Sequence, residues 1–367
     1  MSEYQCYEFI AFDRPLTAKQ MAELRAVSTR ADISQTRFWN DYQWGDLKAD
    51  PEVLLERYFD AHLYFSNGGI RRLMLRVPRA RIDTKALNVF FAGRPRSVCS
   101  RLRGEFVLID LRSDTEEPED DERPRGSLAA LSSLRTELLH GDFRVAYLAW
   151  LLAVQQGDLA DHMTEPPVPL GLATLSAAQR ALVEFLRLDD DLLAAAAHGS
   201  SRLDSDNAAF QRWARRLSPT QQQAWFLRAV EEPELSLGRE LLRAFRAESA
   251  PRISSPRRTV RELRERARAL RAQREAVQTA REQKAQAAAE KRRQRGLDQL
   301  GRQGSAAWTR LEALVVARAY DDALRLAVDL RDLARREGDS HDFLKQFATL
   351  HQRQARRRGF FNRWNRQ

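Results

Sequence analysis

Residues 257–295 read RRTVRELRERARALRAQREAVQTAREQKAQAAAEKRRQR, and this stretch decides the organisation of the chain. It contains no glycine or proline and consists mainly of Ala, Arg, Glu, Gln and Leu, the strongest helix formers. At ~1.5 Å per residue, a continuous helix here would be about 58 Å long. The sequence therefore predicts a long basic helix over residues 250–296, which divides the 367-residue chain into a larger N-terminal part and a smaller C-terminal part.

The apolar residues of this helix favour docking through its first half. Positions a and d of a heptad repeat are filled by Val260, Leu263, Ala267, Leu270 and Val277. Later a and d positions hold the charged residues Arg274, Arg281 and Lys284. An apolar seam this short favours a lone charged helix, or one docked by its N-terminal half, over an extended coiled coil.

Charge is distributed unevenly along the chain. The whole chain has a net charge of +10, and residues 252–295 alone carry 15 basic and 5 acidic side chains. Residues 113–251 carry 14 basic and 23 acidic side chains, a net charge of −9. We therefore expect the basic helix to be matched either by an external polyanion or by acidic surface elsewhere in the chain.

Residues 1–112 are predicted to form an α+β domain with a mostly antiparallel sheet. An Asn-Gly-Gly sequence at 67–69 lies between two strand-like segments, and these residues tolerate the backbone angles of a tight hairpin turn. A second hairpin is predicted around Gly104. Thr17 and Asp50 are predicted helix N-caps, because their side chains can accept the first free N–H groups of a helix.

Two segments of different character follow. Residues 113–126 are strongly acidic and contain almost nothing to bury, so we expect an acidic linker. Residues 127–249 place apolar side chains at helical spacing, and they are predicted to form an all-helical domain of about six helices. The predicted fold class is a multidomain, mainly α protein, in which the α+β domain precedes the all-α domain, the long basic helix and a C-terminal helical hairpin.

The C-terminal region, residues 297–367, is predicted to be a helical hairpin with a basic aromatic tail. Residues 305–337 contain Trp308, Leu311 and the sequence Tyr-Asp-Asp-Ala-Leu at 320–324, and here the chain resembles a single tetratricopeptide repeat. The resemblance implies that two helices pack closely at the Tyr and Ala positions. It implies no peptide-binding groove, because such a groove requires several repeats.

Local sequence motifs for catalysis, cofactors and metals are lacking. The six histidines and two cysteines form no metal-ligand pattern, and no glycine-rich phosphate loop occurs. The three aspartates at 189–191 are interpreted as a helix N-cap rather than a metal site. We therefore expect no cofactor, no metal and no enzymatic activity. An alternative is an enzyme with its site in residues 1–112, where His62 would meet Asp46 or Asp60.

The sequence favours a cytoplasmic location. The first residues, Met-Ser-Glu-Tyr-Gln, lack the basic and apolar segments of a secretory signal. The longest apolar stretch, residues 146–154, is shorter than the ~20 residues that span a bilayer. We expect neither a membrane partner nor a small-molecule substrate.

The basic residues of the long helix and of the tail are the candidate contacts for nucleic acid or another polyanion. The candidate residues are Arg257, Arg258, Arg261, Arg264, Arg268, Arg271, Lys291, Arg292, Arg293, Arg295, Arg356, Arg357, Arg358 and Trp364. Basic side chains along a helix can lie against phosphates without reading the base sequence. No aromatic residue interrupts 252–295, whereas the tail could stack an aromatic ring on a base. Alternatively, Phe360 and Trp364 pack onto the helical hairpin, or the tail lies at an anionic membrane surface.

These patterns lead to one main hypothesis and one further alternative. The hypothesis is a non-catalytic adaptor or accessory subunit that binds a protein partner and contacts nucleic acid non-specifically through the basic helix and tail. The alternative is a pure protein–protein scaffold, whose basic helix docks on an acidic partner or on the chain's own residues 113–251. If the arginines of the helix are already matched to carboxylates of residues 113–251, the helix is internal architecture and the polyanion hypothesis is overturned.

Overall fold

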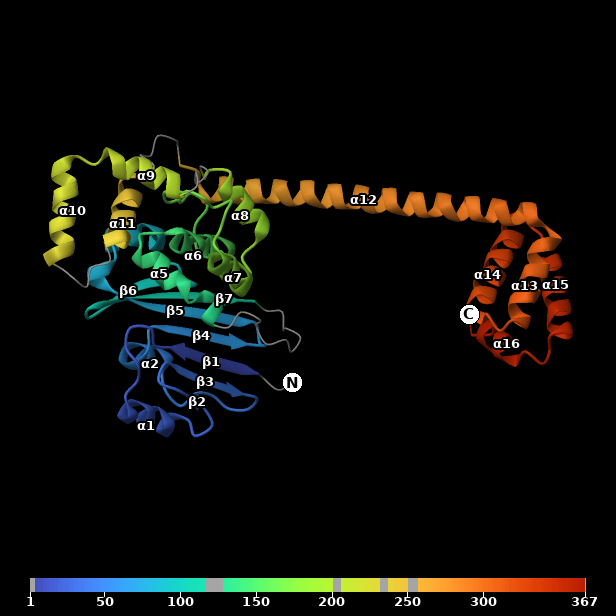
Figure 1. Ribbon diagram of the computed structural model, residues 1–367, viewed down its shortest axis with the longest axis horizontal. Helices are drawn as coiled ribbons and strands as arrows, with labels where there is room; N and C mark the ends of the chain where they lie inside the picture. Colours follow the sequence, from blue (N-terminus) through green and yellow to red (C-terminus); the bar gives the residue numbers. More distant parts are fainter. Residues whose placement is uncertain (1–3, 116–127, 201–205, 232–236, 250–256, 367) are drawn as a thin grey trace. The chain divides into compact units, whose positions relative to one another are not determined.

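A computed structural model of the chain describes residues 4–115, 128–200, 206–231, 237–249 and 257–366 (Figure 1). Residues 116–126 of the predicted acidic linker lie outside these ranges. The contacts between residues divide the chain into two compact units, which we call the N-terminal unit (Met1–Ala272) and the C-terminal unit (Gln273–Gln367).

A seven-stranded antiparallel sheet forms the centre of the N-terminal unit. Its strands are β1 (Gln5–Ile10), β2 (Asp32–Ile33), β3 (Arg37–Tyr42), β4 (Ala61–Ser66), β5 (Ile70–Pro78), β6 (Val98–Arg103) and β7 (Phe106–Asp114), in the order β2-β3-β1-β4-β5-β7-β6. Both predicted hairpins are present, as β4–β5 and β6–β7. Strand β7 extends into the segment predicted as linker, because Asp114 still pairs with Ile70 of β5.

Helices cover both faces of this sheet (Figure 1). On one face lie α1 (Ala18–Val27) and α2 (Pro51–Tyr58), which bury leucines against Phe9 of β1 and Met74 of β5. Both helices begin as predicted. Thr17 forms a capping box with Gln20 at the start of α1. Asp50 precedes α2, and its carboxylate accepts the backbone N–H of Glu52 in the first turn of that helix.

The opposite face of the sheet carries a larger core that later helices share. Alternation along β5 places Leu73, Leu75 and Val77 on this face. The helices are α3 (Thr84–Asn88), α4 (Leu128–Leu131), α5 (Ser133–Leu139), α6 (Arg144–Gln155), α7 (Ala177–Leu186) and α8 (Asp190–Ala197). Every residue of α6 from Val145 to Val154 is buried. The sheet and helices α4–α8 therefore fold around one core.

Three further helices of the N-terminal unit are α9 (Asp206–Arg216), α10 (Pro219–Glu231) and α11 (Leu237–Ser249). Phe210 and Trp213 of α9 lie against Phe245 of α11, with ring centroids 5.6 and 5.7 Å apart. The Trp213 ring N–H also donates a hydrogen bond to Glu248 at 2.6 Å. Helices α9 and α11 are thus held together by an aromatic cluster of their own.

The long helix α12 (Val260–Gln303) begins in the N-terminal unit and ends in the C-terminal unit. It starts three residues after the helix-forming run begins and continues seven residues beyond the predicted end at 296. The extension passes Gly296 and Gly301, each of which costs about 1 kcal/mol in a helix. Burial of Leu297 and Leu300 offsets this cost, at roughly 1.5–3 kcal/mol for each fully buried leucine.

The C-terminal unit packs α13 (Ser305–Val316), α14 (Tyr320–Glu337), α15 (Ser340–Arg353) and α16 (Arg358–Trp364) around a second apolar core with the end of α12. Helices α13 and α14 form the predicted hairpin. Leu311 and Ala323 are fully buried at their contact, and Trp308 packs on Phe343 with ring centroids 5.5 Å apart.

The predicted fold class is confirmed: the chain is multidomain and mainly α, with an antiparallel sheet near its N-terminal end followed by many helices. The cap interpretation of the aspartates at 189–191 also holds. The Asp189 carboxylate accepts the N–H of Asp191 at 2.8 Å and so begins α8. Among the described helices, none combines the length and the apolar character that would let it cross a membrane.

Candidate nucleic-acid interface

The start of α12 is built into the N-terminal unit by backbone pairing. Thr259 forms an antiparallel bridge with Thr164, and the N–H of Glu165 donates to the carbonyl of Arg258 at 2.8 Å. Thr259 then caps the helix, because its hydroxyl accepts the N–H of Glu262 at 3.2 Å while the Glu262 carboxylate accepts the N–H of Thr259. The backbone pairing and the helix cap therefore both hold residues 258–262 in place.

Arg258 is held inside the N-terminal unit by a bidentate ion pair. Its guanidinium donates two hydrogen bonds of 2.8 Å to Glu165, whose side chain is only 2% exposed. It donates a third, of 2.7 Å, to the carbonyl of Ala195 near the end of α8. The Tyr147 hydroxyl also donates to Glu165, and burial together with the carboxylate charge raises the pKa of Tyr147 well above its ordinary value. This predicted contact residue is engaged internally.

Three more predicted contact residues pair with acidic residues of the N-terminal unit. Arg264 lies 2.6 Å from Asp161, and Arg261 lies 3.8 Å from the same residue. Arg271 pairs with Asp189 and Asp191, the residues that begin α8. Together with Arg258, four of the ten predicted basic residues of the helix thus meet carboxylates that lie between residues 161 and 191.

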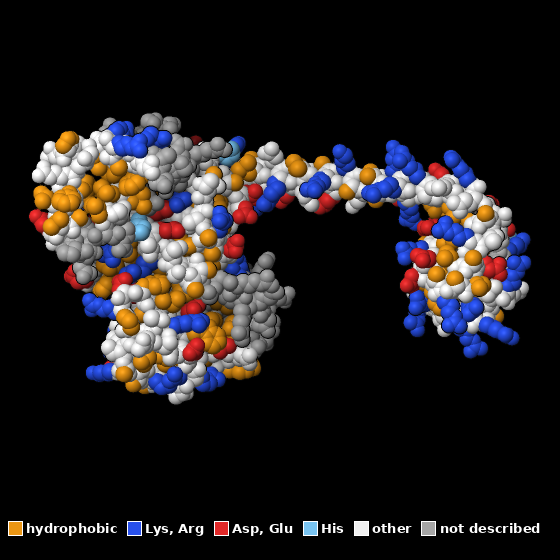
Figure 2. All heavy atoms as spheres, in the orientation of Figure 1, with side chains coloured by type: hydrophobic (Ala, Val, Ile, Leu, Met, Phe, Trp, Pro, Cys, Tyr) orange, Lys and Arg blue, Asp and Glu red, His pale blue; other side chains and the backbone are white. Residues whose placement is uncertain are grey.

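The other basic residues of the helix divide by environment. Arg293 pairs with Asp332 of α14. Arg257, Arg268, Lys291, Arg292 and Arg295 are exposed, and within the described ranges none of them has an ion-pair partner. Figure 2 shows basic side chains along α12 and over the C-terminal unit. Of the ten basic residues predicted as contacts in the helix, these five remain open to an external anion.

The aromatic side chains of the tail pack inward. Phe360 and Phe361 are buried in the core of the C-terminal unit. Trp364 is half-buried, its ring centroid lies 4.8 Å from that of Phe347, and the Arg331 guanidinium covers it at 5.4 Å. The ring of Trp364 is therefore committed to internal packing, and it is not free to stack on a base.

The arginines around these aromatic residues point outward. Arg356 and Arg358 are exposed and Arg357 is half-buried, and in the part of the chain that is described none of the three forms an ion pair. Nearby, Arg363 pairs with Asp321 at 2.7 Å. Over its 95 residues the C-terminal unit has 21 basic and 12 acidic side chains, a net charge of +9. Nearly all the excess charge of the chain therefore belongs to this unit.

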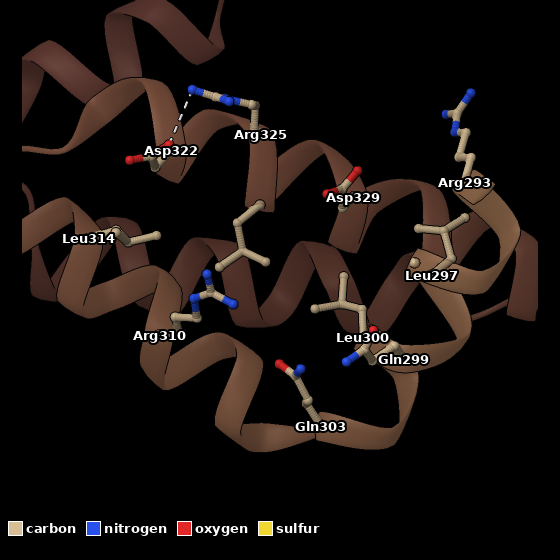
Figure 3. A pocket seen from close by; sticks show the side chains of 12 residues that line it. Arg293, Leu297, Gln299, Leu300, Gln303, Arg310, Leu314, Asp322, Arg325 and Asp329 are labelled. Atoms are coloured by element: carbon tan, nitrogen blue, oxygen red, sulfur yellow. Dashed lines mark ion pairs between the residues drawn. The ribbon is translucent and has the colours of Figure 1, made fainter. Parts of the chain in front are cut away.

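The C-terminal unit also contains a groove between α12, α13 and α14, with a volume of about 580 Å³ (Figure 3). Its apolar side chains come from all three helices and are Leu297, Leu300, Leu314 and Leu326. Its polar side chains include Arg310, which has no ion-pair partner in the described chain, and Arg325, which pairs with Asp322 at 3.2 Å. Sequence reasoning missed this groove because no local motif marks residues that only helix packing brings together.

The residues proposed for an enzymatic site in the sheet region are not brought together. His62 is fully buried, lies 3.1 Å from the carbonyl oxygen of Glu8, and stacks on Phe9 with ring centroids 4.0 Å apart. Burial lowers the pKa of His62 to about 3, so the ring is neutral. Asp46 accepts a hydrogen bond from the Tyr7 hydroxyl at 2.5 Å instead.

Asp60, the other proposed partner of His62, holds the chain in place where β1 ends and β4 begins. Its carboxylate accepts the backbone N–H of Phe12 at 2.7 Å and of Asp13 at 2.9 Å, and it pairs with Arg76 at 2.8 Å. Burial alone would raise the pKa of Asp60, but these donors lower it below its ordinary value. Such an arrangement stabilises the fold.

Metal ligands do not gather anywhere in the described ranges: no group of three or more His, Cys, Asp or Glu side chains could hold a metal ion there. Cys6 is buried, and this burial raises the pKa of its thiol to about 11. Comparisons of the chain with models of known protein families, with curated proteins and with solved structures gave no match.

Proposed function

We propose that the protein is a non-catalytic adaptor or accessory subunit, which binds a protein partner through its N-terminal unit and contacts nucleic acid without sequence preference through its C-terminal unit. The observation that carries the proposal is the net charge of +9 on 95 residues. Several basic side chains of this unit, such as Lys291, Arg292 and Arg358, are exposed and have no acidic partner among the described residues. Phosphates release counterions when such side chains approach them, and this gives affinity without base readout.

The contact set of this proposal is smaller than the set predicted from sequence. It keeps the predicted residues of the C-terminal unit that have no ion-pair partner in the described chain. These are Lys291, Arg292, Arg295, Arg356 and Arg358, which are exposed, and Arg357, which is half-buried. It leaves out the arginines that already meet Asp161, Glu165 and the start of α8. An arginine with two carboxylate hydrogen bonds would lose them in order to bind a phosphate.

The partner-binding part of the proposal is supported by an apolar face of α10. Phe226, Leu227 and Val230 lie at helical spacing, and they are 66%, 48% and 61% exposed. Large apolar side chains exposed on one side of a helix are typical of a surface that packs on another protein. Figure 2 shows hydrophobic side chains gathered over α10 and α11.

A salt titration of full-length protein tests the nucleic-acid part. Fluorescence anisotropy would be measured with two labelled DNA duplexes of equal length and composition but different sequence. We expect equal affinities for both, and a loss on the order of 10³-fold between about 50 and 200 mM salt if all six residues contact phosphates. Affinity that is flat with salt, or strong preference for one sequence, would contradict it.

Two triple variants test which unit of the protein binds the nucleic acid. Arg356→Gln, Arg357→Gln and Arg358→Gln together should weaken binding at least about 10-fold and reduce the salt slope by about 3. The matched control replaces three exposed arginines of the N-terminal unit, Arg14, Arg81 and Arg96, with Gln. Its net charge changes equally, and its salt slope should stay at the wild-type value.

A pull-down with and without nuclease tests the partner-binding part. The wild-type protein should retain a protein partner after nuclease treatment, and Phe226→Glu with Val230→Glu should lose it. The control variant, Thr220→Glu with Gln222→Glu, changes exposed polar positions of the same helix and should retain the partner. Loss of every captured protein on nuclease treatment would contradict a direct protein partner.

The pure scaffold is a second candidate, because a specific observation favours it. The ion pairs of Arg258, Arg264 and Arg271 join the start of α12 to acidic residues of the same unit. A scaffold predicts no shift of labelled DNA or RNA at any salt concentration, with the protein partner retained after nuclease treatment. The salt titration and the pull-down together therefore separate the two functions.

A further inference from the structure

The middle of α12 presents one side of the helix that carries only positive charge. Every residue from Arg271 to Gly296 is exposed. Five of these residues form what we call the basic face: Arg281, Lys284, Lys291, Arg292 and Arg295. In the described chain, none of the five has an ion-pair partner. Two of them, Arg281 and Lys284, also interrupt the heptad repeat of the helix.

Helix geometry brings the five side chains together. At ~100° of rotation per residue, they fall within an arc of ~100° around the helix axis. The glutamates of the same stretch, Glu275, Glu282 and Glu290, fall on the opposite side of the helix by the same rotation. The glutamates of the exposed stretch therefore lie away from the basic face, on the side of the helix that also carries Arg293.

The glutamates do not neutralise the basic face. Gln278 donates a hydrogen bond of 2.6 Å to Glu282, and Gln294 donates one of 2.6 Å to Glu290. An exposed helix that needs stabilising usually has Glu three or four residues from Lys or Arg. No residue of the basic face has a glutamate at that spacing. Its charge therefore contributes little to holding the helix together.

The basic face continues to point outward where α12 joins the C-terminal core. Leu297 and Leu300 are buried there, and by helical rotation they lie on the side of the helix away from Arg295. Asp298 is three residues from Arg295, but it pairs with Arg336 of α14 at 2.7 Å. Packing of the C-terminal unit thus uses the other side of the helix.

We infer that the basic face lies along the sugar–phosphate backbone of a nucleic-acid duplex, an inference that rests on the proposed function. Its residues span about 21 Å along the helix axis, at ~1.5 Å per residue, which equals about six base pairs at ~3.4 Å each. The whole of α12 contains no aromatic residue, so it offers no ring on which the bases of a single strand could stack. The row of charges is held on one side of a continuous helix over this length, so several of its side chains can reach phosphates of the same duplex.

The test measures binding of the full-length protein to a labelled 20-base-pair duplex, to the corresponding single strand and to an oligoglutamate peptide. The variant replaces Arg281, Lys284 and Lys291 with Gln, which preserves helix propensity. The matched control replaces Arg14, Lys19 and Lys48 of the N-terminal unit with Gln. All three control residues are exposed, have no ion-pair partner in the described chain, and repeat the loss of one arginine and two lysines.

The expected result is tighter binding of the duplex than of the single strand, with at least about 10-fold weaker duplex binding by the variant and a salt slope lower by about 2.7. The control should bind as the wild type does. Wild-type duplex binding that the variant retains would overturn the role of the basic face and leave the proposed function intact. Wild-type binding of the single strand without binding of the duplex would overturn the inference alone, and absence of binding to both would overturn the proposed function as well. Loss of oligoglutamate binding alone in the variant would overturn the inference and assign the face to an acidic protein.

Discussion

The first three turns of α12 and its middle are both rich in basic residues but have different environments. Between Val260 and Arg271, Val260 and Leu263 are fully buried. In the same turns, Arg261, Arg264 and Arg271 meet carboxylates. Between Ala272 and Gly296 every side chain is exposed, and the basic face has no acidic partner. The comparison teaches that the availability of a basic residue depends on what other segments bring to it, and not on the charge of its own segment.

Removing the carboxylate of Glu165, which pairs with Arg258 just before α12, should have the largest effect on the free energy of unfolding. Glu165→Ala leaves Arg258 half-buried without its ion-pair partner and should lower the free energy of unfolding by about 3–5 kcal/mol. The measurement is urea denaturation followed by tryptophan fluorescence. The corresponding change in the middle of the helix, Glu282→Ala, should shift the free energy of unfolding by less than about 0.5 kcal/mol. Similar losses for both variants would contradict the comparison.

Truncation of an apolar side chain to alanine should give the second largest difference in the free energy of unfolding between the two regions. Leu263 is fully buried, so Leu263→Ala should cost about 3 kcal/mol through lost burial and the cavity it leaves. Val277 is 64% exposed, and Val277→Ala should cost nothing, because alanine has the higher helix propensity. Thermal and urea unfolding of both variants check this. A loss above about 1 kcal/mol for Val277→Ala would mean that an unidentified surface covers the middle of the helix.

Acidification should reveal the smallest difference, at the first turn of α12. Hydrogen bonds from the N–H and hydroxyl of Thr259 lower the pKa of Glu262 below its ordinary value of 4.5. The cap therefore contributes stability at pH values above 4.5, and this contribution is lost as the pH falls through the lower pKa of the folded state. Comparing wild type with Glu262→Gln between pH 6 and pH 3 tests this. Gln keeps the acceptor but not the charge, so only the wild type should lose this contribution in acid.

Local features of the fold could be predicted because they depend on neighbouring residues. The capping box at Thr17 and the N-cap at Asp189 follow from side chains that accept nearby backbone N–H groups. The Asn-Gly-Gly turn follows from the backbone freedom of its residues, and Gly69 has a φ of +99°. Each of these is decided within about four residues of chain.

Features that depend on distant segments could not be predicted in this way. The apolar stripes of α4–α8 do not say that their partner is the sheet, and nothing in the sequence marks Thr164 as the residue that pairs with Thr259. The internal ion pair of Arg258 could not be predicted for the same reason, because Glu165 lies 93 residues earlier in the chain. The exposed residues of the candidate contact set stay a prediction.

The exposed middle of α12 has a thermodynamic consequence. Its amide protons are protected only by hydrogen bonds within the helix, so a turn can open there without uncovering a buried side chain. Cooperativity passes along the chain through shared cores. The core that α12 joins in the N-terminal unit and the core of the C-terminal unit end on either side of this stretch. Denaturation of the intact chain should therefore be analysed as two separate transitions, since a two-state fit would average over them.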